Sequence, residues 1–292
     1  SATYTDAGVF DFPVGSVLVK SFSVAADLRS PAENRTLVET RLLIRFEDGW
    51  RAFPYIWNEA QTEAFFSPAG EVRPVSFIDA EGEEQTANYL IPQRNQCQSC
   101  HERREDGVTR IVPIGPKARN LNRDFDYGVG VGSVNQLTRL ADLGLLTGLP
   151  DLSEVDAAYD FASIESDGVA GLSSEDLDEA ARTYLDVNCA HCHNPNGVQG
   201  ITSQLFLDYE NMDEFRLGYC KRPGSAGSGT GGHTYDIVPG NPDESILVLR
   251  VETEEAGAMM PLLGLEVDGA VEYRDATSAS WASLTRCTLG MS

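Results

Sequence analysis

The chain has few of the residues that would attach it to nucleic acid or place it in a membrane. Its 292 residues include 22 lysines and arginines against 45 aspartates and glutamates, which gives a net charge of −23. A chain with this much negative charge repels polynucleotides and anionic membrane surfaces. Neither is therefore expected as a partner. No run of about eighteen apolar residues occurs, so no membrane-spanning helix is predicted. The negative charge is compatible with docking to a basic redox partner, or with a high-salt environment in which acidic surfaces keep proteins soluble. An acidic surface that serves only solubility explains the charge equally well.

Cysteine, histidine and methionine are also scarce, and most of the cysteines and histidines fall in two short motifs. The chain has six cysteines, four histidines and four methionines. The motifs are CQSCH at 97–101 and CAHCH at 189–193. In a CxxCH motif the two thiols can bond to one haem, and the histidine that follows can bind its iron. The sequence therefore predicts two covalently bound c-type haems, held by Cys97, Cys100, His101, Cys189, Cys192 and His193.

Two other sites are compatible with paired CxxC spacing. Four thiolates could bind a single zinc ion, and one CxxC could be a redox dithiol. Neither site needs a histidine directly after the second cysteine, yet His101 and His193 both stand there. We therefore favour haem over zinc or a dithiol.

The motifs also indicate where the protein works. Bacteria attach haem to CxxCH outside the cytoplasmic membrane, so a periplasmic or extracellular protein is expected. A chain that starts at Ser1 without an apolar leader is expected to be a mature form whose signal peptide has been removed. In that oxidising compartment Cys220 and Cys287 are expected to form a disulfide.

Hydrophobic periodicity predicts an α+β fold in three parts. Residues 1–110 form a β-rich haem domain after a loose leader at 1–9, and alternation places Leu18, Lys20 and Phe22 on one strand face. Residues 111–170 form a connector, and residues 171–292 form an all-α domain. Predicted strands are 16–24, 38–46, 50–57, 75–78 and 87–91, and predicted helices are 58–66, 133–143, 173–189, 244–251 and 278–284.

The part after residue 171 resembles a class I cytochrome c. A helix runs into the CxxCH of LDVNCAHCHNPNG, IVPGNPDESILVLR supplies a second helix, and Met259-Met260-Pro261 follows. In that family the methionine of such a Met-Pro element is the distal iron ligand. The resemblance therefore implies Met260 opposite His193, with Met259 as the rival. A thioether ligand raises the reduction potential and favours electron transfer.

The N-terminal part resembles a β-sheet haem family. FPVGSVLVKSF at 12–22, Gly49-Trp50 and the later CxxCH are similar to the lysine-cross-linked cytochromes of ammonia oxidisers and their cytochrome c-prime-beta relatives. In the cross-linked members a lysine of this strand bonds to the haem, which implies Lys20; otherwise a strand lysine reaches solvent or an ion pair. With LVETRLLIRFEDGW, YIWNEAQTEA and IGPKARNLNRD, the whole chain also resembles an uncharacterised bacterial family of dihaem c-type cytochromes.

The distal ligand of the first haem stays open in the sequence. His233, His191 and Met212 are candidates, although His191 is expected to face solvent or a propionate. The c-prime-beta resemblance implies instead an empty distal site under an apolar lid. No catalytic acid–base group stands out, so electron transfer to a redox partner is the first hypothesis. The alternatives are a haem enzyme acting on a small nitrogen compound or peroxide at the N-terminal haem, with the other haem as relay, and self-association into a conductive filament.

Overall fold

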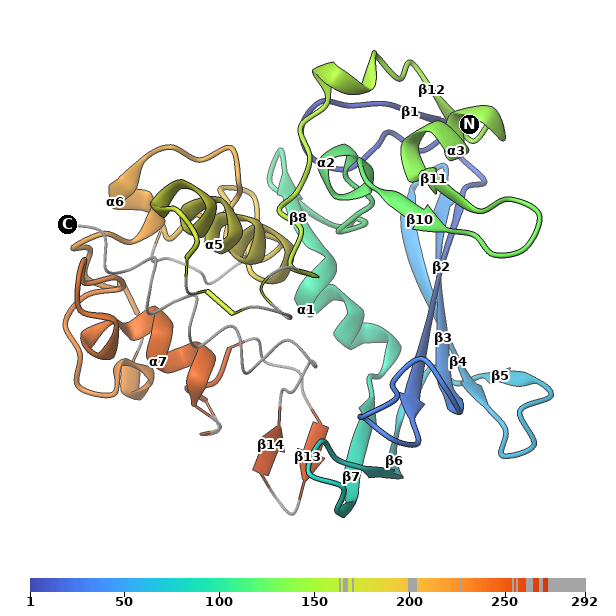
Figure 1. Ribbon diagram of the computed structural model, residues 1–292, viewed down its shortest axis with the longest axis horizontal. Coiled ribbons are helices and arrows are strands. Elements are labelled where there is room, and N and C mark those ends of the chain that lie inside the picture. Colours follow the sequence, from blue (N-terminus) through green and yellow to red (C-terminus); the bar gives the residue numbers. More distant parts are fainter. Residues whose placement is uncertain are drawn as a thin grey trace.

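The computed structural model mixes strands and helices, and the fold class is α+β as the sequence predicts (Figure 1). No helix within the described part of the chain is both long enough and apolar enough to cross a membrane. The structure describes residues 1–162, 164, 168–169, 171–198, 204–225, 227–253, 255, 257–260, 265–267 and 270–272.

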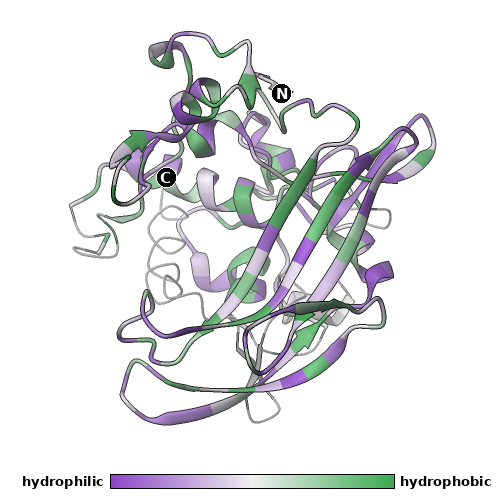
Figure 2. Cartoon of the chain, turned by 90° about the vertical axis from the view of Figure 1, so that its right-hand side faces the viewer, coloured by the Kyte–Doolittle hydropathy of each residue, from purple (hydrophilic) through white to green (hydrophobic). Residues whose placement is uncertain are grey.

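An antiparallel sheet in the order β2-β3-β4-β5 dominates the N-terminal part, and polar and apolar residues alternate along its strands (Figure 2). The predicted helix at 58–66 is wrong. Gln61 adopts a left-handed backbone (φ 56°), and its side-chain amide bonds both the N–H and the carbonyl of Leu37 at 2.7 and 3.0 Å. These bonds fix a turn that leads into a fourth strand. The strands are β2 (Val17–Ala25), β3 (Arg35–Phe46), β4 (Gly49–Trp57) and β5 (Ala64–Phe66).

The covered face of this sheet carries charged residues among its apolar ones. Cross-strand register aligns Lys20 with Arg41, and Phe22 with Glu39. Glu39 is fully buried. A bulge between β2 and β3 leaves Val38 without a partner on β2, and Val38 packs with other buried residues. The sequence pattern placed Val38 and Glu39 on opposite faces, but the bulge lets both be buried.

A second sheet leads into the first CxxCH motif. Its order is β14-β13-β7-β6. After β7 the chain forms the 3-10 turn η1 (Arg94–Cys97) and then α1 (Gln98–His101), which together hold the motif. β13 and β14 lie in the part expected to be all α, which is therefore wrong for these residues, and the predicted helix at 278–284 lies outside the described residues. The strands of this sheet are β6 (Glu71–Ile78), β7 (Glu84–Ile91), β13 (Leu265–Val267) and β14 (Ala270–Glu272). A separate hairpin follows α1 in the chain and consists of β8 (Glu102–Glu105) and β9 (Val108–Ile111).

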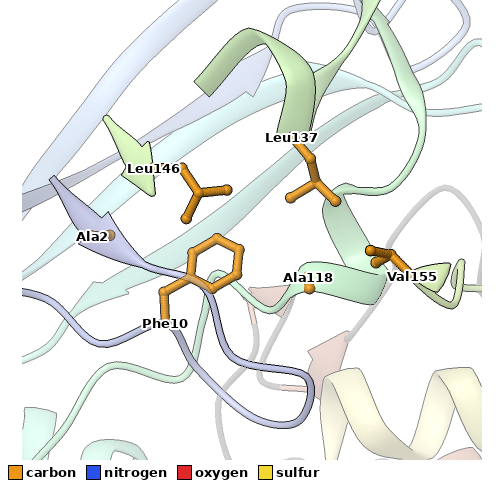
Figure 3. Close-up of a cluster of buried hydrophobic side chains, with 6 residues drawn as sticks. All are labelled: Ala2, Phe10, Ala118, Leu137, Leu146 and Val155. Atoms are coloured by element: carbon orange, nitrogen blue, oxygen red, sulfur yellow. The ribbon is translucent and has the colours of Figure 1, made fainter. Parts of the chain in front are cut away.

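The leader and the connector fold together into a small core of their own (Figure 3). β1 (Ala2–Thr3) pairs in parallel with β12 (Leu146–Thr147). The expected connector helix is present as α3 (Gln136–Asp142). The expectation of a loose leader is wrong, because its side chains are buried against residues more than a hundred positions later. The buried members of this core are Ala2, Phe10, Ala118, Leu137, Leu146 and Val155.

The second motif follows a helix, and short elements make up the rest of the described chain. α5 (Ser174–Asn188) begins at a capping box formed by Ser173 and Asp176, as the sequence predicts, and runs directly into Cys189. The other short elements are α2 (Ala118–Leu121), β10 (Asp124–Asp126), β11 (Ser133–Asn135), η2 (Leu152–Glu154), α6 (Glu214–Leu217), η3 (Gly227–Thr230), η4 (Pro242–Glu244) and α7 (Ile246–Glu252).

Candidate functional site

The two CxxCH motifs, distant in the sequence, lie against each other. The Cys192 thiol is 3.7 Å from the carbonyl oxygen of Ser99. The N–H of Arg104 donates to the carbonyl of Asn196 at 2.8 Å, just after the motifs. Figure 1 accordingly draws α1 next to the end of α5. The structure therefore brings the two predicted haem-attachment motifs into one neighbourhood.

The residue that follows β9 holds the imidazole of His101 in the first motif. The Nδ1 atom of His101 lies 2.8 Å from the carbonyl oxygen of Val112. The Val112 N–H in turn donates to the His101 carbonyl at 2.8 Å. When Nδ1 carries the hydrogen and donates it to Val112, the lone pair of Nε2 is free to bind a metal. Cys97 and Cys100 stand three residues apart on the same helical stretch, so both thiols project to one side.

The second motif continues the helix that precedes it. The N–H groups of Cys192 and His193 both donate to the carbonyl of Cys189, at 3.1 and 2.8 Å. This helical turn places Cys189, Cys192 and His193 on one side, with His191 on the other. The His193 carbonyl accepts the N–H of Leu207 at 2.8 Å, which fixes the end of the turn.

The imidazoles of both motifs are neutral at pH 7. Burial lowers the pKa of His101, although the Val112 carbonyl opposes the fall. Burial lowers the pKa of His193 to about 4. The Leu205 backbone opposes that fall, yet the buried Nδ1 of His193 has no hydrogen bond of normal geometry within the described residues. Neutral imidazole is the form that binds a metal.

The four motif thiols suit thioether attachment better than a shared zinc site. All four are free, and burial raises the pKa of each, for Cys189 to about 12 and for Cys192 to about 11. Zinc would need thiolates converging on one point. No three His, Cys, Asp or Glu side chains in the described ranges are grouped in that way. Two separate thiol pairs, each followed by a neutral imidazole, fit two haem groups.

The first motif faces the charged side of the sheet. Next to burial and the Val112 bond, Arg41 and Lys20 lower the pKa of His101 through their charge. Burial lowers the pKa of Lys20 as well, Arg41 adds to this, and Glu39 and Cys100 oppose it. The Lys20 ammonium thus lies near Arg41, Glu39 and Cys100, although the residue is exposed. Lys20 is therefore close enough to Cys100 and His101 for their charges to interact.

A buried carboxylate organises these charges. Glu39 accepts two hydrogen bonds from the Arg41 guanidinium, at 2.5 and 2.8 Å. The hydroxyl of Tyr89 donates to the same carboxylate at 2.9 Å. Glu39 has no exposed surface, so its charge depends on these partners. Strand alternation gives no sign that Glu39 is buried, so sequence reasoning missed this network.

The methionine segment lies against α7 and near the second motif. The Met260 N–H donates to the carbonyl of Arg250 at 2.7 Å, and the Arg250 side chain donates to the carbonyl of Ala258 at 2.8 Å. After burial and the Leu205 backbone, Arg250 acts on the pKa of His193 and lowers it. Met259 is buried and Met260 is half-buried. Met260 and the neighbouring Ala258 are therefore held at Arg250, whose charge reaches His193, and Pro261 lies outside the described residues.

The other candidate ligands are placed differently. Met212 is 77% exposed and points to solvent. The backbone N–H of His233 donates to the carbonyl of Thr230 at the end of η3, and η3 packs on α7. His191, which the sequence predicts to face solvent or a propionate, is half-buried. Its Nδ1 is buried without a partner in the described part of the chain, and burial, then His101, lower its pKa to about 4. Cys220 is exposed, and Cys287 lies outside the described residues.

The connector contributes a buried ion pair that sequence reasoning missed. The Lys117 ammonium lies 2.7 Å from both carboxylate oxygens of Asp186, in the last turn of α5. The Arg119 guanidinium lies 3.4 Å from the ring centroid of Tyr209. Lys117 and Arg119 lie in the IGPKARNLNRD segment, where three basic residues in so acidic a chain were the available signal. This segment fastens the connector to the helix that carries the second motif.

Comparison of the chain with family models, curated proteins and solved structures finds no match.

Proposed function

We propose that this protein is a dihaem c-type cytochrome that transfers electrons outside the cytoplasmic membrane. The observation that carries the proposal is the contact between the two CxxCH motifs, 3.7 Å between Cys192 and Ser99. Thioether bonds hold a haem edge next to its cysteines, so motifs in contact would keep two cofactors close together. Electrons entering at one site can then leave from the other.

The proposal gives each side chain a task. A c-type haem supplies one-electron chemistry at its iron. Cys97 and Cys100 would hold the first group, and the Val112 carbonyl would keep His101 oriented as its ligand. Cys189, Cys192 and His193 would do the same for the second group. Met260 would supply a thioether ligand to the second group. In this architecture the β-rich part is one haem domain and the α5-to-α7 part is a class I cytochrome c-like domain.

The charge of the protein favours a basic redox partner. With a net charge of −23, the surface attracts a partner of opposite charge and speeds its approach. The rate of electron transfer to such a partner should fall as salt screens the attraction. A stopped-flow series in increasing salt measures this directly. A rate that rises with salt would point to an acidic partner or to self-association instead.

Haem content after cysteine substitution tests the proposed function. The chain is produced in a host that attaches c-type haem, and the pyridine haemochrome spectrum is recorded. We expect two haems per chain, one in the double variant Cys97→Ala with Cys100→Ala, and one in Cys189→Ala with Cys192→Ala. Cys220→Ala is the matched control, because this exposed cysteine lies outside both motifs, and it should retain two. A wild-type protein without haem would refute the proposal.

One observation favours a second function, that of a haem enzyme. The charges of Lys20 and Arg41 act on His101, whereas the candidate ligand Met212 is exposed to solvent. A first haem without a distal protein ligand would bind and transform a small nitrogen compound or peroxide, with the second haem as relay. Spectra with nitric oxide, hydroxylamine and peroxide separate the two functions. Ligand-induced changes at one haem favour the enzyme, and two inert low-spin haems exclude it.

A further inference from the structure

Lys20 and Arg41 form a like-charge pair on the covered face of the sheet. They are directly opposite each other on β2 and β3. Both cations approach the ring of Phe22, with the Lys20 Nζ at 4.8 Å and the Arg41 guanidinium carbon at 4.3 Å from its centroid. Like charges at opposed positions of an antiparallel pair destabilise it. The Phe22 ring offers each cation some attraction, but it supplies no net negative charge.

A single carboxylate serves this pair of cations. Glu39 is bound through both oxygens to Arg41 and also accepts the Tyr89 hydroxyl. Lys20 makes no ion pair or hydrogen bond within the part of the chain that the structure describes. Two positive charges against one negative charge leave an excess of one beside the first motif. Because Lys20 is exposed, water solvates its ammonium, and an anion that the other described residues of this face do not supply can replace that water.

We propose that Lys20 and Arg41 form a binding site for a small oxyanion, a carboxylate or a nitrogen oxyanion of similar size, beside the first CxxCH motif. The ammonium of Lys20 donates hydrogen bonds to the anion, and Glu39 keeps the Arg41 guanidinium in position next to it. The inference rests on the proposed function, because the first motif makes the bound anion a neighbour of a haem. A free solute and a haem propionate share this chemistry, and the experiment separates them.

The position of Lys20 lets a solute reach the site. Lys20 is exposed, whereas Glu39, which lies opposite Phe22, is fully buried. The protein as a whole, at −23, repels anions, so binding by general attraction is not expected. Any saturable anion binding therefore needs a local cationic site, and the excess charge of Lys20 supplies one.

Anion titration of matched variants tests the proposal. Sodium nitrite and sodium formate are added separately to the oxidised holoprotein, with ionic strength held constant by sodium chloride, and the Soret band is followed. We expect saturable binding that weakens at least tenfold in Lys20→Gln and persists in Lys20→Arg. Arg35→Gln, at an exposed position on β3, is the control and should bind like the wild type. Thermal unfolding in the same salts gives a second readout that does not need haem.

The outcomes separate the two sources of the anion. If a propionate occupies the site, neither probe binds, and Lys20→Gln lowers the reduction potential of one haem, because a neighbouring positive charge is lost. The proposal is overturned if binding survives in Lys20→Gln, or if neither the probes nor the potentials respond to the substitution. If the haemochrome assay detects no haem, the proposed function is refuted. The thermal unfolding measurements then test the anion site by themselves.

Discussion

The Cys192 thiol lies 3.7 Å from the carbonyl oxygen of Ser99, and this contact joins the ends of two independent parts of the chain. One part reaches it from the β-sheets through α1, and the other reaches it from α5. The Arg104 to Asn196 hydrogen bond supports the same junction. The proposed electron path crosses at this point, so the residues that hold the junction are the first to test.

Lys117→Gln should destabilise the protein by about 3–5 kcal/mol, because it leaves the buried carboxylate of Asp186 without its cation. Urea unfolding of the purified protein measures the loss. Arg51→Gln breaks an exposed ion pair with Asp48 and should cost less than about 1 kcal/mol. The double variant Lys117→Gln with Asp186→Asn should recover part of the stability. Equal losses at Lys117 and Arg51 would contradict the buried link.

Asp208→Asn should stabilise the protein at neutral pH. Burial raises the pKa of Asp208, so the folded state holds this proton more tightly than the unfolded state. Stability from this group is therefore present below the ordinary carboxyl pKa of about 3.9 and is lost as the pH rises through the higher folded pKa. The variant should unfold at a higher temperature than the wild type at pH 7.

Thermal scans across pH test the sign of this effect. The gain from Asp208→Asn should shrink as the pH falls toward about 3.9, where the wild-type carboxyl is also protonated. Glu47→Gln, at an exposed turn position, should show no such trend. A gain that grows in acid would mean that Asp208 is stabilised as an anion.

Leu137→Ala tests whether the leader and connector form a real core. Leu137 is fully buried among residues of both segments, so its truncation should cost about 2–5 kcal/mol. Leu145→Ala, at a position 54% exposed, is the control and should change stability by no more than about 0.5 kcal/mol. Denaturant unfolding compares the two. Similar small effects would show that the segments are loosely attached.

Ser173→Ala should weaken the start of α5 by about 0.5–2 kcal/mol, because the Ser173 hydroxyl caps the helix through the N–H of Asp176. Ser174→Ala, one residue later and without that bond, should be close to neutral. Helix content and unfolding midpoint, followed by circular dichroism, measure both. A larger loss in Ser174→Ala than in Ser173→Ala would place the helix start elsewhere.

The sequence predicts the elements whose causes are local. The alternating strands and α5 with its Ser173 and Asp176 box follow from residues a few positions apart. What it misses depends on distant partners. The carbonyl of Ala2 accepts the hydroxyl of Thr147, across nearly the whole N-terminal half. The side chain of Gln61 binds Leu37 on β3, and this bond fixes a turn where the sequence predicts a helix.

The candidate site divides in the same way. Both CxxCH motifs can be recognised from their spacing alone, and the strand periodicity places Lys20 on the same face as Phe22. The burial of Glu39 is not legible, because it depends on the guanidinium of Arg41 and the hydroxyl of Tyr89 reaching it from other positions. The contact between Cys192 and Ser99 depends on tertiary packing, and no local sequence pattern predicts it.

The most direct test of the central claim is the denatured, intact mass of the protein purified from a host that matures c-type cytochromes. The account predicts the mass of the chain plus two haem groups, which remain attached after unfolding because thioether bonds hold them at Cys97, Cys100, Cys189 and Cys192. A mass equal to the bare chain, or a bound zinc ion that is released on unfolding, would contradict it.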